Sequence, residues 1–289
     1  MTHQEKIVTV EAIERAIAQK GSQNALAASL KGVSSATLSQ MRNHNWTNIA
    51  VEMWRKVGSQ LGTTNTGWNF ANTRNSQDLI QFFTDSQKDQ LVLAITGKAG
   101  SGKTVTAKKY SEENKNVFLL SCNEYWDKRW FLRELLAQMG KDHSGMTLPE
   151  MMHKAVQLLK SLEDPLIILD EADKLADNVL LFFITLYNEL EEHCGIILMA
   201  THYLEKRVKR GVAVEKKGYR EIYSRVGLRF IELYPTTFSD VEKVCKANGI
   251  EDQGSIRAIS KDCDGDVRRV RRLIFSAKRN KDNNNGEAV

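Results

Sequence analysis

A glycine-rich loop that ends in lysine and threonine carries the clearest chemical signal in this sequence. Residues 97–104 read GKAGSGKT and fit the pattern GxxxxGK[ST] at every required position. The loop lies between a strand-like apolar run and a helical segment, where backbone N–H groups and the helix N-terminus would face a chain of phosphates. We therefore expect the phosphates of ATP to be bound by Gly97, Ala99, Gly100, Ser101, Gly102, Lys103 and Thr104.

Four side chains in and after this loop are suited to Mg·ATP chemistry. We expect Lys103 to neutralise the β- and γ-phosphates and the Thr104 hydroxyl to bind Mg²⁺. The apolar run 166–169 ends in Asp170 and Glu171, and α/β sheets bind ligands at the carboxyl ends of their strands. Asp170 is expected to bind nucleotide through Mg²⁺, and Glu171 to orient and deprotonate the attacking water. The two motifs together predict ATP hydrolysis.

Strand-like and helix-like segments alternate around these motifs. Mainly apolar runs typical of strands occur at 91–96, 117–121, 166–169 and 195–200, and a fifth strand is predicted at 228–233. Helical patterns lie between them, for example at 105–113, 149–162 and 179–193. This alternation predicts an α/β fold with an open, mainly parallel sheet. After Pro235 only helical patterns follow, at 239–248, 255–263 and 267–278.

These patterns divide the chain of 289 residues into five parts. The length allows one large core with small satellites. We expect a helical head at 1–62, a linker at 63–76, the α/β core at 77–234, a helical lid at 235–280 and a disordered tail at 281–289.

Composition excludes several classes of protein. The longest apolar runs are strand-sized and the N-terminus lacks a signal-like apolar segment, so we expect no membrane span and no secretion. The four cysteines form no CxxC pair, which favours reduced thiols in a cytoplasm and no zinc site. Basic residues outnumber acidic ones by seven to four in 1–70 and by 20 to 13 in 201–289, whereas acidic residues lead by 19 to 14 in 71–200. Basic ends favour a polyanionic partner, and chance clustering on a solvated surface is the alternative.

With the helices that follow the fifth strand, the two motifs resemble those of AAA+ ATPases. The resemblance implies that Thr201, where Asn is commoner in the family, acts as a sensor of the γ-phosphate. It implies an arginine finger that acts on a neighbouring subunit's nucleotide, for which Arg225 is our choice and Arg220 and Arg229 are alternatives. Arg268, in a Gly-Asp-Val-Arg run, resembles the lid arginine that reaches the γ-phosphate. Taken singly, each of these residues also fits an ordinary surface position.

The head resembles helix-turn-helix domains of the phage-repressor type. The similarity rests on Gln23, Leu26, Ala27, Gly32, Val33, Ser34, Leu38 and Ser39, with a turn one residue longer than usual. It implies a third helix that presents polar side chains to a DNA groove, namely Ser35, Thr37, Gln40 and Arg42. This helix carries few cations, which argues against tight sequence-specific binding. A helical bundle used for protein contacts is the alternative.

Two further segments are expected to contact DNA. The run 123–130 follows the second strand, where AAA+ rings and filaments carry a loop that faces their channel, and it contains Tyr125, Lys128 and Arg129. Trp130 in the same run is expected to pack against the core. A basic segment after Thr201 contains Lys206, Arg207, Lys209 and Arg210. A DNA backbone lying along these cations would be bound with little sequence preference.

The order of these features is similar to that of the phage Mu B family of transposition proteins, over most of the chain. The resemblance implies an ATP- and Mg²⁺-dependent protein of the bacterial host cytoplasm that binds duplex DNA largely without sequence preference. It also implies assembly into an ATP-dependent helical oligomer, selection of target DNA and stimulation of a transposase. Two alternatives stay open. An AAA+ helicase loader would favour single strands, and a helix-turn-helix transcription regulator that binds nucleotide would protect one operator.

Overall fold

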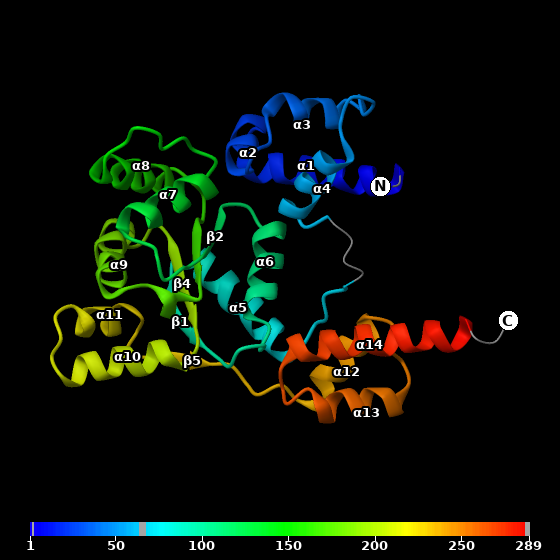
Figure 1. The fold of residues 1–289 in the computed structure, drawn as a ribbon. Coiled ribbons are helices and arrows are strands. Elements are labelled where there is room, and N and C mark those ends of the chain that lie inside the picture. Colours follow the sequence, from blue (N-terminus) through cyan, green and yellow to red (C-terminus); the bar gives the residue numbers. More distant parts are fainter. Residues whose placement is uncertain (2, 64–67, 287–289) are drawn as a thin grey trace.

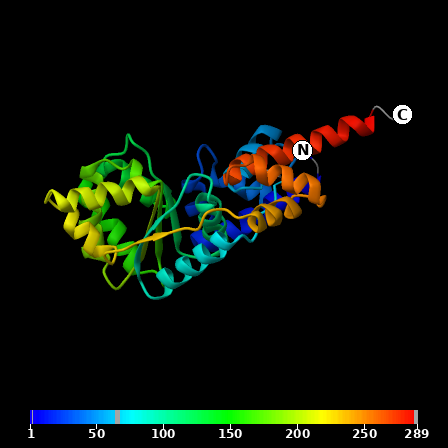
Figure 2. The same ribbon diagram turned by 90° about the horizontal axis from the view of Figure 1, so that it is seen from below.

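The computed structural model describes residue 1 and residues 3–63 and 68–286. Figure 1 shows three parts: a helical head, an α/β core and a helical lid that ends in the long C-terminal helix. In the view of Figure 2 the core and the lid lie side by side, and the end of the last helix projects beyond the other elements.

The core is built on a parallel sheet with the strand order β2-β3-β4-β1-β5. The strands are β1 Val92–Thr96, β2 Val117–Ser121, β3 Leu166–Asp170, β4 Gly195–Ala200 and β5 Phe230–Glu232. The predicted α/β fold is therefore confirmed. The fifth strand is shorter than expected because Gly227 and Leu228 adopt positive φ values of 73° and 57°, which places a turn directly before it. All strands point the same way, so the loop after β1 lies beside the ends of β3 and β4.

Helices cover both faces of the sheet because side chains alternate along each strand. Ile167 and Leu169 belong to a hydrophobic cluster on one face, whereas Leu166 and Ile168 belong to the cluster on the other. The first face is covered by α7 Lys128–Gln138, α8 Leu148–Lys160, α9 Asp177–Leu190, α10 His202–Ala213 and α11 Tyr219–Arg225. The second face is covered by α5 Arg74–Lys88 and α6 Lys103–Glu113.

The head contains α1 His3–Lys20, α2 Gln23–Ser29, α3 Ser35–Arg42 and α4 Val51–Gln60, packed around buried residues such as Trp54. Fewer polar side chains of its third helix are available for contact with DNA than predicted, because two of them are bonded within the head. The Ser35 hydroxyl donates to Asn24, and the Arg42 guanidinium pairs with Glu14 at 2.6 Å. Arg42 thus braces α3 against α1 instead of facing outward. The helix-turn-helix assignment itself stays a prediction.

The lid contains α12 Phe238–Ala247, α13 Gln253–Asp262 and α14 Val267–Gly286. Part of the predicted linker packs on it: Trp68 joins the hydrophobic cluster of the lid, and the Asn69 N–H donates to Asn248 at 2.8 Å. Helix α5 already begins within the predicted linker. The predicted disordered tail is helical at 281–286, because α14 continues past its last apolar residues. Residues 64–67 of the linker and 287–289 of the tail lie outside the described residues.

The four cysteines are free thiols, and each is buried. Burial raises the pKa of the Cys122 and Cys194 thiols, so both remain protonated and are poor nucleophiles and metal ligands. Within the described ranges, no helix is both long enough and apolar enough to span a bilayer.

Candidate nucleotide-binding site

A cleft of about 510 Å³ lies where the phosphate loop, the carboxyl ends of β3 and β4, and helix α14 of the lid meet. This volume is typical of small-molecule sites. The core side of the cleft is lined by residues 99–105, Asp170, Glu171, Asp173, Lys174, Ala200 and Thr201. The lid and the segment before α5 contribute Trp68, Val267, Arg268, Arg271, Arg272 and Phe275. The fold thus brings the two predicted motifs together.

The phosphate loop turns on two glycines. Gly100 and Gly102 have φ values of +80° and +91°, which a side chain would strain. Helix α6 begins directly after them at Lys103, and the Gly97 N–H donates to the carbonyl at the end of β4 at 3.2 Å. The backbone therefore curls between strand and helix as the phosphate-binding motif requires, with the positive end of α6 at the cleft.

The ammonium group of Lys103 lies inside this curl. It donates to the carbonyl oxygens of Gly97 at 2.7 Å and Lys98 at 3.1 Å, and to the Ser101 hydroxyl at 3.2 Å. Burial lowers the pKa of Lys103, while the nearby charge of Asp170 acts in the opposite direction. These acceptors belong to the loop itself, so an incoming phosphate could replace them without moving another part of the protein.

Thr104 and Asp170 form the pair predicted to hold Mg²⁺. The Thr104 hydroxyl is hydrogen-bonded to Asp170, whose side chain also accepts from the Glu171 N–H at 3.0 Å. Burial raises the pKa of Asp170, and these two bonds lower it. Among the described residues no group of three His, Cys, Asp or Glu side chains could hold a metal. The hydroxyl and carboxylate oxygens fit Mg²⁺, which would complete its shell with phosphate oxygens and water.

Glu171, the predicted base, also lies at the cleft. Its φ is +56°, a left-handed conformation that costs a non-glycine residue about 1–2 kcal/mol and is enriched at functional sites. Lys174 donates to its carboxylate at 2.6 Å. Lys174 was not predicted as a site residue, although its spacing of three residues from Glu171 is visible in the sequence.

Thr201 is held by an acid, Asp173, that was likewise not predicted as a site residue. Its hydroxyl donates to the Asp173 carboxylate at 2.6 Å and accepts from the Tyr203 N–H at 3.3 Å, which caps α10. Both Thr201 and Asp173 line the cleft. They come from the ends of β4 and β3, so neighbouring strands place them side by side.

The lid docks directly on the phosphate loop. The Val267 N–H donates to the Gly100 carbonyl at 3.1 Å. A Cβ at Gly100 would lie only 1.9 Å from the Asp266 carboxylate, so glycine is needed for this close approach. Asp266 in turn accepts from the Arg268 N–H at 2.7 Å at the start of α14. This contact places the exposed Arg268, the predicted lid sensor, at the edge of the cleft.

An aromatic wall closes the lid side of the cleft. The rings of Trp68 and Phe275 lie 6.2 Å apart, and the Arg271 guanidinium lies 5.3 Å from the Trp68 ring. Such surfaces stack well on the flat face of a nucleobase. Sequence reasoning missed this wall, and the available signal was a tryptophan in a linker rich in Thr and Asn.

Arg225 lies away from its own chain's cleft. Its guanidinium stacks 4.6 Å from the Tyr187 ring and lies 3.9 Å from Glu191. Both partners belong to the end of α9, which leads into the amino end of β4, whereas the phosphate loop borders the carboxyl end. The alternatives Arg220 and Arg229 are exposed. Any action of Arg225 on a nucleotide would therefore involve a neighbouring chain.

The loop after β2 differs from the prediction in its aromatic residues. Trp130, which was expected to pack, is 42% exposed, and Trp126 is buried in its place. Trp130 meets Tyr125, which is 66% exposed, edge to face at 6.0 Å, and Arg133 lies over its ring at 4.8 Å. The prediction that Trp130 packs against the core is therefore wrong.

The predicted DNA cations have unequal surroundings. Lys128 lies 5.8 Å from the ring of Phe182, and Arg129 donates to the Met146 carbonyl at 2.7 Å. On α10, three cations are exposed, namely Lys206, Lys209 and Arg210. Arg207 turns inward to Asp177 instead, so its predicted contact with DNA is not supported. Helix geometry explains the difference, since Arg207 lies three residues after the buried Leu204 and four before the buried Gly211, on the same side of α10.

Residues 84–208 match the family model of the AAA domain. The matched range runs from the second half of α5 into α10 and contains the phosphate loop, Asp170, Glu171 and Thr201. No curated protein matches this chain. The match supports an AAA+ P-loop ATPase core that binds nucleotide, and it does not distinguish between the groups of such ATPases.

Proposed function

We propose that this protein is an ATP-dependent AAA+ ATPase that assembles on duplex DNA, selects target DNA and stimulates a transposase. One observation carries the ATPase part: the lid backbone bonds to Gly100, so that Arg268 lines the same cleft as Asp170, Glu171 and Thr201. The DNA part is supported by exposed cations and aromatic rings. The transposase part rests on the resemblance of the motif order to the Mu B family.

Each core residue of the cleft has a task in this proposal. Lys103 exchanges its loop carbonyls for phosphate oxygens. Thr104 and Asp170 hold Mg²⁺, which withdraws charge from the phosphates when bound. Glu171 takes the proton of the attacking water. It must first leave Lys174, and because both side chains are partly exposed, this pair contributes only about 0–1 kcal/mol.

Hydrolysis requires a second chain in this proposal. Arg225 lies near the amino end of β4, and the nucleotide cleft lies at the carboxyl end. A neighbouring chain that offers its Arg225 to this cleft would supply the missing positive charge in the transition state. Assembly on DNA would then control turnover.

DNA binding is proposed for two exposed surfaces of the core. One combines Tyr125 and Trp130 with Arg133, a combination of rings and guanidinium that contacts nucleic acids without reading sequence. The other is the outer face of α10, with Lys206 and Arg210. Contacts of this kind neutralise phosphates, which gives strong salt dependence and little sequence preference.

The basic lid helix is the proposed face for a transposase or for further duplex. Its exposed cations include Arg269, Arg271, Arg272 and Arg279. If the partner stimulates hydrolysis, DNA is released wherever the partner already lies, and insertion is directed elsewhere. In this proposal, the cycle of ATP binding and hydrolysis thus determines which DNA stays bound as a target.

Electron microscopy with duplex DNA and a non-hydrolysable ATP analogue tests the assembly. We expect filaments on duplex DNA with the analogue and none without nucleotide. Adding the transposase encoded beside this gene should then raise ATP turnover and direct strand transfer into the coated DNA. Assembly with a replicative helicase on single strands would favour a helicase loader instead. Protection of one short operator at high salt would favour a transcription regulator.

The salt dependence of binding tests the α10 surface. Replacing Lys206 and Arg210 by alanine together should weaken binding to all sequences alike and reduce the slope of log K against log salt by about 1.8. Lys88 and Lys160, exposed cations on α5 and α8, provide a charge-matched control pair. If the control pair changes the slope equally, the effect is one of net charge and α10 is not the binding surface.

A further inference from the structure

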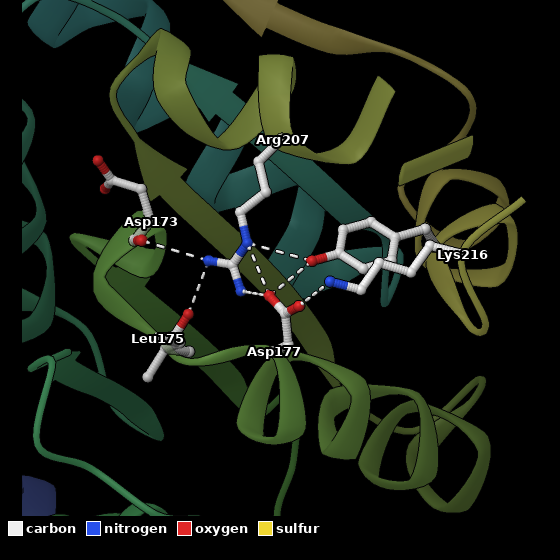
Figure 3. A network of polar contacts seen from close by, with 6 residues as sticks. Asp173, Leu175, Asp177, Arg207 and Lys216 are labelled. Atoms are coloured by element: carbon white, nitrogen blue, oxygen red, sulfur yellow. Dashed lines mark hydrogen bonds and ion pairs between the residues drawn. The ribbon is translucent and has the colours of Figure 1, made fainter. Parts of the chain in front are cut away.

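A charged network lies just behind the cleft, on the side of the core covered by α9, α10 and α11. Figure 3 shows Arg207 of α10 at its centre, with Asp177 at the start of α9 and Lys216 reaching the same carboxylate. Tyr219 of α11 donates to Asp177 at 2.7 Å. Four segments of the chain therefore meet at one carboxylate and one guanidinium.

Arg207 also contacts the backbone that carries the cleft residues. Its Nη1 donates to the Leu175 carbonyl at 2.7 Å and to the Asp173 carbonyl at 3.4 Å (Figure 3). These carbonyls belong to the short 3₁₀ turn η1 Ala172–Lys174 and the residue after it. The turn holds two side chains of the cleft: Asp173 accepts from Thr201, and Lys174 donates to Glu171.

The chemistry of this contact requires arginine. Nε and Nη2 bond to Asp177, while Nη1 is directed at the two carbonyls of the turn. The planar guanidinium can direct donors at an acid and at a backbone simultaneously, whereas an ammonium group is a single point of charge. The Arg207 side chain is only 15% exposed, so these bonds replace most of its contact with water.

Close packing between α10 and α11 also fixes the network. A Cβ at Gly211 would lie 2.4 Å from the Tyr219 ring, so α10 and α11 touch without room for a larger residue. The hydrogen bonds from Lys216, Tyr219 and Arg207 lower the pKa of Asp177, which keeps its carboxylate charged. These contacts fix the position of the Arg207 side chain. Arg207 in turn fixes the position of η1 through its bonds to the Leu175 and Asp173 carbonyls.

We infer that Arg207 is a positioning residue for ATP hydrolysis, which holds η1 so that the Asp173–Thr201 pair points its hydroxyl into the cleft. This inference rests on the proposed ATPase function. Arg207 itself is not among the residues that line the cleft. Its loss would let the turn relax by a fraction of an ångström, enough to misplace Thr201 while the phosphate loop stays intact.

A double-mutant cycle tests this inference with the full-length protein. Arg207→Met is expected to lower kcat for ATP by about 10- to 100-fold while KM and the affinity for a fluorescent ATP analogue stay close to wild type. In a Thr201→Val background the same change should lower kcat less than about twofold further, because both changes act through one hydroxyl. Equal losses in both backgrounds would overturn the inference, and so would an unchanged kcat with a lower melting temperature.

Three further variants separate positioning from stability. Arg207→Lys can keep the charge pair with Asp177 but lacks the donors for the carbonyls, so its kcat should fall as in Arg207→Met even if the methionine variant folds poorly. Tyr219→Phe removes the hydroxyl that donates to Asp177 and accepts from the Arg207 Nε at 3.2 Å, but it leaves the Nη1 bonds to the Leu175 and Asp173 carbonyls in place, so kcat should stay within about twofold of wild type. Arg257→Met, an exposed arginine on α13, is the matched control for loss of a charge. A kcat near wild type in Arg207→Lys would overturn the inference. A wild-type protein that does not hydrolyse ATP would overturn the proposed function and this inference with it. If the wild type is active and the kcat losses of Arg207→Met and Thr201→Val add in full, only the inference is overturned.

Discussion

Replacing Gly100 by alanine would test whether the lid must touch the phosphate loop for the nucleotide to bind. The added Cβ would lie 1.9 Å from the Oδ1 atom of Asp266, 2.5 Å from its Cγ and 3.1 Å from its Cα. Rotating the Asp266 side chain away would break its 2.7 Å bond with the Arg268 N–H, which caps α14. The close approach of the methyl group to the Asp266 backbone would remain, so the lid would have to move as well.

The expected loss has two components. The left-handed φ of +80° costs an alanine about 1–2 kcal/mol in any folded state, and this component lowers stability without changing ATP affinity. Displacing the lid removes Arg268 from the cleft, and a hydrogen bond to a charged group contributes about 1.5–3 kcal/mol. The second component predicts ATP binding that is weaker by about 10- to 100-fold.

Gly227→Ala supplies the matched control for backbone strain. Its φ is +73°, and an added Cβ meets nothing within 4 Å. Both variants should melt at similarly reduced temperatures, but in titrations with a fluorescent ATP analogue only Gly100→Ala should bind weakly. Equal affinities in the two variants would refute the lid argument.

A second substitution separates the lid from the phosphates. Asp266→Ala removes the two closest contacts of the added methyl group. If the clash with the lid is the cause, Gly100→Ala should weaken ATP binding less in an Asp266→Ala background than in wild type, because only the 3.1 Å contact with the Asp266 Cα remains. Losses that add in full would mean that the methyl group obstructs the nucleotide directly, and the reasoning from lid contact would then be wrong.

Three further predictions follow from the cleft, from the position of the finger and from the interface between head and core. Lys103→Ala should abolish binding of the ATP analogue, whereas Glu171→Gln should bind it and remain on DNA without turnover; equal affinity in Lys103→Ala and wild type would contradict the assignment. Arg225→Ala should keep ATP affinity and lose about 10³-fold in turnover, and wild-type turnover per subunit should rise with protein concentration; flat turnover would argue against a finger in trans. Lys20, at the end of α1 in the head, donates to the Gln138 carbonyl at the end of α7 in the core, and burial lowers its pKa to about 8, which penalises its charged form in the folded state. Lys20→Met should therefore melt at a higher temperature than wild type at pH 7. Melting scans should show this gain shrinking as the pH rises from about 8 to about 10.4, because in this range the folded lysine has lost its proton whereas the unfolded lysine still binds one, and releasing that proton on folding costs less as the pH rises.

Local patterns determined how much of this fold could be predicted. Four of the five strands are mainly apolar runs, and the phosphate loop is defined by residues adjacent in the sequence, so both were visible without coordinates. Helix α10 was missed because only Leu204, Val208 and Gly211 of its 12 residues are buried, which leaves a weak apolar pattern in the sequence. Trp68 and Phe275 could not be paired in advance, since only the docking of the lid brings them together.

The sequence could not show which residues the predicted site side chains contact. Arg42, Arg129 and Arg207 all belong to segments predicted to contact DNA, yet each is bonded within the chain, to Glu14, to a backbone carbonyl and to Asp177 respectively. A count of charges cannot separate a cation that faces solvent from one that satisfies a buried acceptor. The same holds for Trp126 and Trp130, whose exchange of buried and exposed positions depends on how α7 meets the sheet.

These internal partners narrow the surfaces on which duplex DNA could lie. A phosphate at Arg207 would have to replace bonds in a mostly buried network, whereas at Lys209 it would displace only an exposed pair with Glu205, which is weak and screened by salt. Helix α14 is different, because it carries cations on two sides: Arg268 and Arg271 line the cleft, and others, such as Arg279, are exposed farther along. One helix that contacts the nucleotide at its start and offers cations beyond it can pass a change at the phosphate loop to a bound polyanion. Since linkage is reciprocal, DNA that binds along α14 would strengthen ATP binding by the same factor as ATP strengthens DNA binding.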